Sequence, residues 1–403
     1  MTTTPPPPRR RVLMVSRVGF LGGVERIMLT LAGGLQAHGW DAVLACPPEG
    51  ALARAARGRC LEMAPSPFDR MRISANPLVL GHYPLAWLRG ARSVERHCRQ
   101  HGIDLIHVHH PVTALYARRA SRALGIPMIL HVHETLPARP LYAAAMRAVV
   151  GHAAAVLCVS QAARALAQAL GADAARTQVV HNGIDARFLT AGEPFMVPEP
   201  LQNAGPGPHV GIFGMLEPRK AQHVLLEAAA LLAGRFPTAR FWLVGTAALR
   251  DKQGYARELA RQAAAPPLQG RVRLVGFQAD VAPWLAAMDV VVQTSVAYES
   301  FGMALAEAMA LGRPVVGSRA GGIPEVIGDG LGGSIVPPGD PAALAAALAP
   351  LLGSPDLRRE LGKKAAAAAR RRFAPGMFCD AVARVYEAAV PHAASRGLAD
   401  ALS

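Results

Sequence analysis

The sequence has few cysteines and no long uncharged hydrophobic run, and each of these absences narrows the class of protein. The five cysteines lie far apart without paired spacing, which argues against a disulfide framework and against a zinc site, so we expect a cytoplasmic protein. No window approaches the roughly 18 uncharged apolar residues that a membrane-spanning helix needs. Even the alanine-rich stretch from Leu141 contains Arg147 and His152. The sequence therefore predicts a chain that does not cross a membrane.

Acidic residues are scarce in the first half of the chain. Up to residue 190 there are 22 arginines and 10 acidic residues, so this half carries +12 of the formal net charge of +15. Such a field favours an anionic partner, which can be nucleic acid, a phospholipid surface or a phosphate-bearing substrate. No recognisable nucleic-acid motif accompanies the charge, so we expect no nucleic-acid partner. A genome-wide preference for arginine is an equally good explanation of the charge.

The apolar segments alternate between strand-like and helical periodicity, which predicts an α/β chain of two doubly wound domains. The proline- and arginine-rich start is typical of a disordered tail, and Arg17 interrupts the following apolar run too early for a signal peptide. A Gly- and Pro-rich stretch then separates the two βα series. The expected parts are a tail at 1–11, a first domain at 12–190, a linker at 191–208, a second domain at 209–373, a last helix at 374–390 and a tail at 391–403.

The same periodicity predicts individual elements. Strands are expected at 12–16, 41–46, 105–108, 128–131 and 155–159 in the first domain and at 209–214, 241–244, 271–275, 287–295 and 312–318 in the second. Helices are expected at 24–37, 94–100 and 114–124 in the first domain and at 221–235, 255–264, 342–352, 354–372 and 375–389 further on.

Two glutamates, Glu299 and Glu307, flank the start of a predicted helix that is rich in small residues and follows the apolar run 287–295. Glu299 falls at the carboxyl end of a strand, where open α/β sheets bind their ligands. A helix that begins near Phe301 or Gly302 leaves its first N–H groups without intrahelical partners, and phosphate oxygens bind at such an end. Glu307, about two turns further on, can accept hydrogen bonds from sugar hydroxyls. The pattern predicts a site for a nucleotide diphosphate; the alternative is two solvated carboxylates on an amphipathic helix.

Seven short motifs follow one another along nearly the whole chain. They are Gly22–Glu25, Asp104–His110, His131–Glu134, Asn182–Asp185, Gly214–Lys220, Glu299–Glu307 and Gly321–Glu325. In this order they resemble the motifs of retaining glycosyltransferases of the GT-B fold, in glycosyltransferase family 4. The resemblance implies two Rossmann-like domains that face each other across a cleft, the first for the acceptor and the second for a nucleotide-sugar. It also implies a final helix that crosses back to the first domain.

The resemblance implies roles for individual residues. Lys220 would be a cation on the donor diphosphate with Arg219 beside it, Glu299 would lie under the donor sugar, and Glu307 would bind the ribose. His133 would contact the sugar from the first domain. The expected catalytic residues are Glu299, His133 and Lys220, and the expected nucleotide-sugar contacts are Gly22, Gly23, Arg219, Lys220, Phe301, Gly302, Met303 and Glu307.

The departing diphosphate gathers negative charge as the sugar–phosphate bond breaks. Glycosyltransferases of the other main fold stabilise that charge with a metal held by an Asp-x-Asp pair, which this sequence lacks. A lysine, an arginine and a helix N-terminus can take its place. We therefore expect a metal-independent, hexosyltransferase-like enzyme with no cofactor beyond its UDP- or GDP-linked co-substrate. Retention of configuration is expected from the resemblance alone.

Two positions depart from the family pattern. Met215 stands where the family usually has a second diphosphate-binding arginine, and Ala221 stands where a glycine is common. The first departure favours the alternative of a non-catalytic partner subunit of the same fold. A sugar-nucleotide epimerase of this fold is another alternative. A dehydrogenase is disfavoured, because the first turn lacks the Gly-x-Gly-x-x-Gly fingerprint.

Four histidines alternate along two predicted strands, His107 with His109 and His131 with His133. No Asp, Glu or Cys is spaced nearby to complete a tetrahedral set, so we expect no metal site. His107 and His131 are interpreted as partly buried strand histidines whose hydrogen bonds are satisfied.

The basic first domain indicates where the reaction takes place. We expect a glycan or lipid-linked acceptor in bacterial polysaccharide biosynthesis, with peripheral contact between the enzyme and an anionic inner membrane face. A soluble acceptor is the open alternative.

Overall fold

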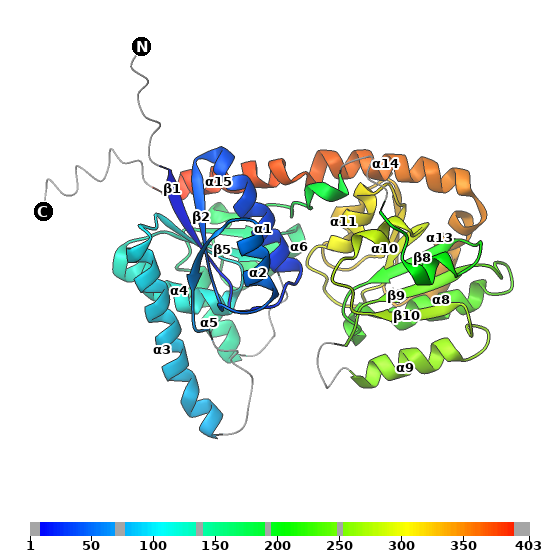
Figure 1. The fold of residues 1–403 in the computed structure, drawn as a ribbon, viewed down its shortest axis with the longest axis horizontal. Helices are drawn as coiled ribbons and strands as arrows, with labels where there is room; N and C mark the ends of the chain where they lie inside the picture. The colour runs from blue at the N-terminus through cyan, green and yellow to red at the C-terminus, as the bar shows by residue number, and fades with distance from the viewer. Residues whose placement is uncertain (1–8, 69–76, 134–139, 190–194, 248–252, 391–403) are drawn as a thin grey trace, which may run out of the picture. The chain divides into compact units, whose positions relative to one another are not determined.

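The structure, a computed structural model, describes residues 9–68, 77–133, 140–189, 195–247 and 253–390 (Figure 1). The chain divides into two compact units. The first consists of residues 1–183 and 375–403, and the second of residues 184–374. The division falls after Gly183, so residues 184–190 belong to the second unit although the sequence places them in the first domain. Residues 1–8 and 391–403 of the expected tails, residues 191–194 of the expected linker and residue 190 lie outside the described residues.

A seven-stranded parallel sheet with the order β3-β2-β1-β4-β5-β6-β7 forms the first unit. Its strands read as apolar runs because helices cover both faces of such a sheet. The strands are β1 (Arg10–Val15), β2 (Trp40–Cys46), β3 (Glu62–Pro65), β4 (Leu105–Val108), β5 (Met128–Val132), β6 (Ala155–Cys158) and β7 (Thr177–Val179). The α-helices before the last one are α1 (Gly23–Gly34), α2 (Ala51–Gly58), α3 (Pro77–Gln100), α4 (Pro111–Leu124), α5 (Pro140–Val150) and α6 (Gln161–Ala169).

The first strand begins at Arg10, two residues before the predicted start. Arg10 and Arg11 pair in register with Trp40 and Asp41 of β2. Arg10 Nη1 also lies 2.6 Å from Glu387 Oε2, and the Arg11 guanidinium contacts the Glu62 carboxylate. These ion pairs stabilise two charged residues at the start of β1. Apolar periodicity alone therefore predicts a strand that begins two residues too late.

The last helix, α15 (Pro375–Ala389), packs in the first unit beside α1. The Tyr386 ring meets the Trp40 ring edge-on at 5.0 Å between centroids, and Trp40 Nε1 donates to Glu387 Oε1 at 2.9 Å. Gly34 allows a close approach, because a Cβ there would lie 2.3 Å from Cys379 Sγ. The final helix of the chain therefore belongs to the unit that contains the first strand.

A six-stranded parallel sheet with the order β10-β9-β8-β11-β12-β13 forms the second unit. Buried aliphatic side chains such as Val210, Ile212 and Leu225 fill the space between sheet and helices. The strands are β8 (His209–Phe213), β9 (Arg240–Val244), β10 (Val272–Gly276), β11 (Val290–Gln293), β12 (Val315–Ser318) and β13 (Gly333–Val336). The α-helices are α7 (Glu199–Gln202), α8 (Gln222–Leu232), α9 (Gln253–Ala264), α10 (Ala282–Ala286), α11 (Met303–Ala310), α12 (Ile323–Ile327), α13 (Pro341–Gly353) and α14 (Pro355–Phe373).

In each sheet the direction of the strand order reverses once, and this switch point is where a ligand site is expected. In the first unit β1 lies between β2 and β4, and in the second β8 lies between β9 and β11. Ligands of open α/β sheets bind outside the carboxyl ends of the strands at such a switch point. Across the described ranges, no helix combines the length and the apolarity that a membrane crossing would require.

Candidate functional site

Lys220 and Glu299 lie together at the switch point of the second unit. Lys220 ends a 3₁₀ turn (Pro218–Lys220) after β8, and Glu299 lies in the loop after β11. Lys220 Nζ is 2.6 Å from Glu299 Oε2, and the two side chains are only 14% and 12% exposed. Because β8 and β11 are neighbours, two residues 79 positions apart form one buried ion pair.

Three further groups surround this pair. Ser295 Oγ donates to Glu299 Oε2 at 3.3 Å, and Arg219 Nη1 lies 3.6 Å from the same oxygen. Arg219 Nε also pairs with Glu217 Oε1 at 2.7 Å. Burial alone would raise the pKa of Glu299, but the Lys220 ammonium and the Arg219 guanidinium outweigh burial and lower it below its ordinary value. The Glu299 carboxylate therefore stays charged at neutral pH.

The glycine-rich turn predicted at residues 321–325 holds the backbone of Glu299. Gly322 N donates to Glu299 O at 2.7 Å. Gly321 has a φ of +55°, and a Cβ there would lie 1.9 Å from Glu299 O. Only glycine fits at this position, since a side chain would push the Glu299 backbone away.

Helix α11 begins beside Glu299, at Met303 rather than at the predicted Phe301 or Gly302. Gly302 caps the helix with a φ of +104°, a conformation that glycine adopts without strain and that delays the start of the helix. Phe301 is buried with its ring 5.5 Å from that of Phe373. Glu307 lies in the second turn of α11 and is 9% exposed. One loop, between β11 and α11, therefore supplies both Glu299 and the N-terminus of α11.

The two departures from the family pattern differ in their structural setting. Met215 is 44% exposed, and its carbonyl accepts a hydrogen bond from Gln222 Nε2 at 2.8 Å. The Met215 side chain therefore adds no charge to the site. Ala221 has a φ of +49°, a left-handed conformation that costs a non-glycine residue roughly 1 to 2 kcal/mol.

Gly22 and Gly23 lie at the switch point of the first unit, where α1 begins. Gly22 N donates to Glu25 Oε2 at 3.1 Å, and Ser16 Oγ lies 3.4 Å from Glu25 Oε1. Burial raises the pKa of Glu25, although these two hydrogen bonds oppose the shift. We did not predict a role for Glu25 or for Glu217. Gly22 and Glu25 have the spacing of a capping box, and this spacing could have indicated from the sequence that Glu25 binds the start of α1.

His133 belongs to a group of four buried histidines in the first unit. β4 and β5 pair side by side, and the four imidazoles gather on one face with ring centroids 4.0 to 5.4 Å from their neighbours. His109 Nδ1 lies 3.1 Å from His133 Nε2, and His107 Nδ1 lies 2.6 Å from Tyr386 Oη. Burial lowers the pKa of all four, that of His133 to about 3.

The interpretation of His107 and His131 as partly buried is wrong. Their interpretation as satisfied is wrong for His131 and for Nε2 of His107, whereas Nδ1 of His107 contacts Tyr386 Oη. Each is 0% exposed, and neither ring nitrogen of His131 has a hydrogen-bond partner among the described residues. The prediction considered each strand by itself, whereas register brings the two pairs together. Glu134, next to His133 in the sequence, lies outside the described residues.

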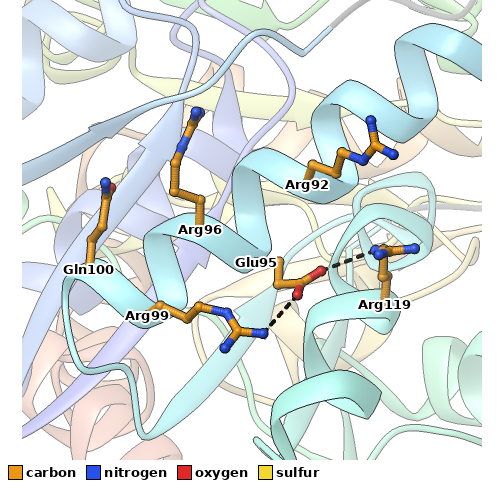
Figure 2. A pocket seen from close by; sticks show the side chains of 6 residues that line it. All are labelled: Arg92, Glu95, Arg96, Arg99, Gln100 and Arg119. Atoms are coloured by element: carbon orange, nitrogen blue, oxygen red, sulfur yellow. Dashed lines mark hydrogen bonds and ion pairs between the residues drawn. The ribbon is translucent and has the colours of Figure 1, made fainter.

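A group of arginines lines a shallow pocket of about 450 Å³ on α3 and α4. Figure 2 shows Glu95 between Arg99 and Arg119. Its carboxylate oxygens lie 3.0 Å from Nη2 of Arg99 and 3.1 Å from Nε of Arg119. Arg92 and Arg96 extend from α3, the helix that also contains Glu95. The lining contains none of the predicted site residues. Four arginines around one glutamate leave a net positive surface.

Comparison with known proteins matches both units to glycosyltransferase families. Residues 21–188 match the family described as Glycosyltransferase Family 4, and residues 207–354 match Glycosyl transferases group 1. The phosphatidyl-myo-inositol mannosyltransferase of Mycobacterium leprae is 30% identical over 381 residues, which cover 91% of this chain and 93% of the relative. A D-inositol 3-phosphate glycosyltransferase of Catenulispora acidiphila is 31% identical over 309 residues, 71% of each chain.

Solved structures agree with these matches. HepE of Anabaena, solved with UDP and glucose, superposes with a TM-score of 0.78 at 25% identity and covers 94% of this chain and 100% of its own. The sucrose-phosphate synthase of Thermosynechococcus elongatus shares the fold with a TM-score of 0.74. The two parallel-sheet, Rossmann-like units are therefore those of a GT-B glycosyltransferase. The chain belongs to glycosyltransferase family 4 and is an enzyme, which confirms the resemblance read from its motifs.

Proposed function

We propose that this glycosyltransferase moves a hexose from a UDP- or GDP-linked sugar to a phosphate-bearing glycan or lipid-linked acceptor, with retention of configuration and without a metal ion on the diphosphate. The observation that carries the proposal is the buried Lys220–Glu299 ion pair beside the start of α11. The pair places a cation and an anion a few ångströms apart. Cleavage of the sugar–phosphate bond requires both, because it builds negative charge on the diphosphate and positive charge on the sugar.

Lys220 stabilises the diphosphate as it departs. Its ammonium has three N–H donors, so it can bind a phosphate oxygen while it keeps its hydrogen bond to Glu299. Arg219, 38% exposed, is near enough to share this task. The amides at the start of α11 add partial positive charge. Turnover should therefore be the same with and without added Mg²⁺ or Mn²⁺, and a strict requirement for either would contradict the proposal.

Glu299 faces the sugar, on which positive charge develops as the sugar–phosphate bond breaks. Its lowered pKa keeps it anionic at neutral pH, so it stabilises that charge electrostatically. Glu307 binds the ribose hydroxyls from the second turn of α11. In the first unit, His133 contacts the sugar, and Gly22 and Gly23 bring backbone close to the phosphates. Retention of configuration follows from family membership and is checked by the anomeric form of the product.

A thermal-shift screen over UDP-, GDP- and ADP-sugars tests the donor site. A ligand at about 100 times its dissociation constant should stabilise the protein by roughly 2.7 kcal/mol. Glu307→Ala should abolish the shift, whereas Glu299→Gln should retain it and stop turnover. The control Glu227→Ala removes an exposed glutamate of α8 and should change neither. Normal turnover in both site variants would overturn the assignment.

The acceptor is proposed from charge. Two relatives are named for acceptors that contain inositol and phosphate, and the first half of this chain is strongly basic. The arginine-lined pocket on α3 and α4 is the described feature that suits an anionic membrane surface. We propose that this surface brings the enzyme to a lipid-linked acceptor.

Vesicle sedimentation tests the membrane contact. The enzyme should bind vesicles that contain an anionic lipid, lose binding as salt rises, and ignore purely zwitterionic vesicles. Arg92→Glu combined with Arg96→Glu should weaken binding, whereas Arg370→Glu combined with Arg371→Glu, an equivalent double charge reversal at exposed positions of α14, should have a smaller effect. Binding that resists salt, or no binding, would contradict this part of the proposal.

An epimerase of the same fold would act without an acceptor. Incubation with the donor alone separates the two chemistries, because a transferase then releases little nucleoside diphosphate. Rapid formation of an isomeric sugar under those conditions would favour the epimerase.

A further inference from the structure

The four buried histidines of the first unit have more nitrogens than hydrogen-bond partners. Five ring nitrogens have no partner among the described residues: Nε2 of His107, Nε2 of His109, both nitrogens of His131, and Nδ1 of His133. All four residues are at most 7% exposed. A buried polar atom without a partner destabilises the fold, so a ligand for these nitrogens would be favoured.

The hydrogen bonds that do exist orient two of the rings. Tyr386 Oη contacts Nδ1 of His107, and Nε2 of His133 contacts Nδ1 of His109. If the Nδ1 atoms carry the protons, the Nε2 lone pairs of His107 and His109 are free. Histidines that bind metals usually donate their second N–H to a fixed partner in this way. The positions of the ligand atoms agree, because one nitrogen from each of His107, His109 and His131 lies within 4.8 Å of the others.

We propose that His107, His109 and His131 bind one divalent transition-metal ion of the zinc, cobalt or nickel class. Imidazole is a preferred ligand of these ions, whereas Mg²⁺ and Ca²⁺ require oxygen. At a metal–nitrogen distance of about 2.0 to 2.1 Å, tetrahedral ligand atoms lie about 3.3 Å apart, so binding draws the three imidazoles inward. Three histidines leave a fourth position for water.

The site lies outside the transfer reaction proposed above and has a structural consequence of its own. It joins β4 to β5 and, through Tyr386, joins both strands to α15. Metal binding free energy then adds to the stability of the first unit. If the proposed sugar contact of His133 is correct, coordination of His109 also fixes the His133 tautomer, because Nε2 of His133 accepts from His109 and Nδ1 is left as the donor.

Zinc and cobalt titrations of the chelator-treated, full-length protein test the proposal. One equivalent of Zn²⁺ should bind per chain by calorimetry and raise the melting temperature, with Mg²⁺ giving no shift. X-ray absorption of the zinc-loaded wild type should show three imidazole nitrogens at about 2.0 to 2.1 Å. No stoichiometric binding, or a shell with fewer than three imidazoles, would overturn the proposal and leave a metal-free histidine array.

Variants localise the ion. His131→Leu and His109→Leu each replace an imidazole by an apolar side chain of similar size, and each should abolish stoichiometric binding and the melting shift. The control His152→Ala removes a histidine of the same unit that bonds Ser121 Oγ at 2.9 Å, and it should leave binding unchanged. Circular dichroism without metal verifies that the variants fold. Full binding by both leucine variants would contradict the assignment even if the wild type binds zinc.

Discussion

Both units contain buried polar groups at or near the carboxyl ends of strands in a parallel sheet, but they stabilise them differently. In the second unit, Lys220 and Glu299 are both charged and paired at 2.6 Å. In the first unit, four imidazoles are kept neutral by burial, and several of their nitrogens have no partner among the described residues. A buried charge without its counterion costs far more free energy than a neutral ring whose lone pair has no partner. The first arrangement suits charge separation, and the second suits ligation.

The largest expected effect is the loss of one member of the ion pair. Lys220→Met leaves the Glu299 carboxylate buried without its main partner, which typically costs about 3 to 5 kcal/mol of folding free energy. Chemical denaturation at pH 7 measures the loss. The double variant with Glu299→Gln should recover most of it, because it no longer buries a charge. An equally unstable double variant would show that packing, not charge, dominates.

Catalysis should respond on a similar scale. Losing one electrostatic donor to the departing diphosphate typically costs about 2.7 to 4 kcal/mol, so Lys220→Met should lower turnover roughly 10²- to 10³-fold. Steady-state rates at saturating donor measure the effect. Lys363→Met removes an exposed lysine of α14 and serves as the control. A turnover unchanged by Lys220→Met would separate the buried pair from the chemistry.

The pH dependence of the free energy of unfolding should differ between the wild type and Lys220→Met. The pKa of Glu299 is lower in the folded protein than the ordinary 4.5, so its contribution to stability is present above about pH 4.5 and is lost as the pH falls through the folded-state pKa. Without Lys220, burial dominates and raises that pKa. Lys220→Met should then gain stability relative to the wild type between pH 7 and 4.5. Parallel denaturation profiles of the two proteins would contradict this explanation.

Adding a charge should be milder than removing one. Met215→Arg restores the cation that the family usually has after β8, at a position that is 44% exposed. We expect donor affinity to rise about tenfold, or about 1.4 kcal/mol, because solvent weakens a half-exposed phosphate contact. Calorimetric titration with the donor identified by the screen measures this change. A weaker affinity would show that the arginine repels Lys220 more than it attracts phosphate.

The second unit was the more predictable from sequence. Glu299 and Lys220 could be singled out because each follows an apolar strand, and α13 and α14 were predicted within one residue of their observed bounds. The 2.6 Å contact between Glu299 and Lys220 could not be predicted, since it depends on which strands are neighbours. Short elements such as β3 were missed because four residues carry too little periodicity.

The histidines show why the first unit was harder. A strand pattern fixes which side chains share a face, but pairing between strands decides which of them meet. His107 pairs opposite Ile129, so the histidines of β4 and those of β5 share one face of the sheet. Helix α3 was also underestimated. It begins at Pro77 rather than near residue 94, because Pro84 interrupts the helical pattern in the sequence but not in the fold.

The smallest effect should come from Tyr386, whose phenol contacts His107. Tyr386→Phe removes the hydroxyl that lies 2.6 Å from His107 Nδ1 and leaves the ring against Trp40. A typical buried hydrogen bond contributes about 1 kcal/mol, so chemical denaturation of the metal-free protein should show a loss near that value. With Zn²⁺ present the loss should be larger, because the hydroxyl then orients a coordinating ring. Equal losses with and without zinc would mean that the Tyr386 hydroxyl stabilises the packing of α15 and does not orient a metal ligand. The two units would then differ only in how they bury polar groups, and not in metal binding.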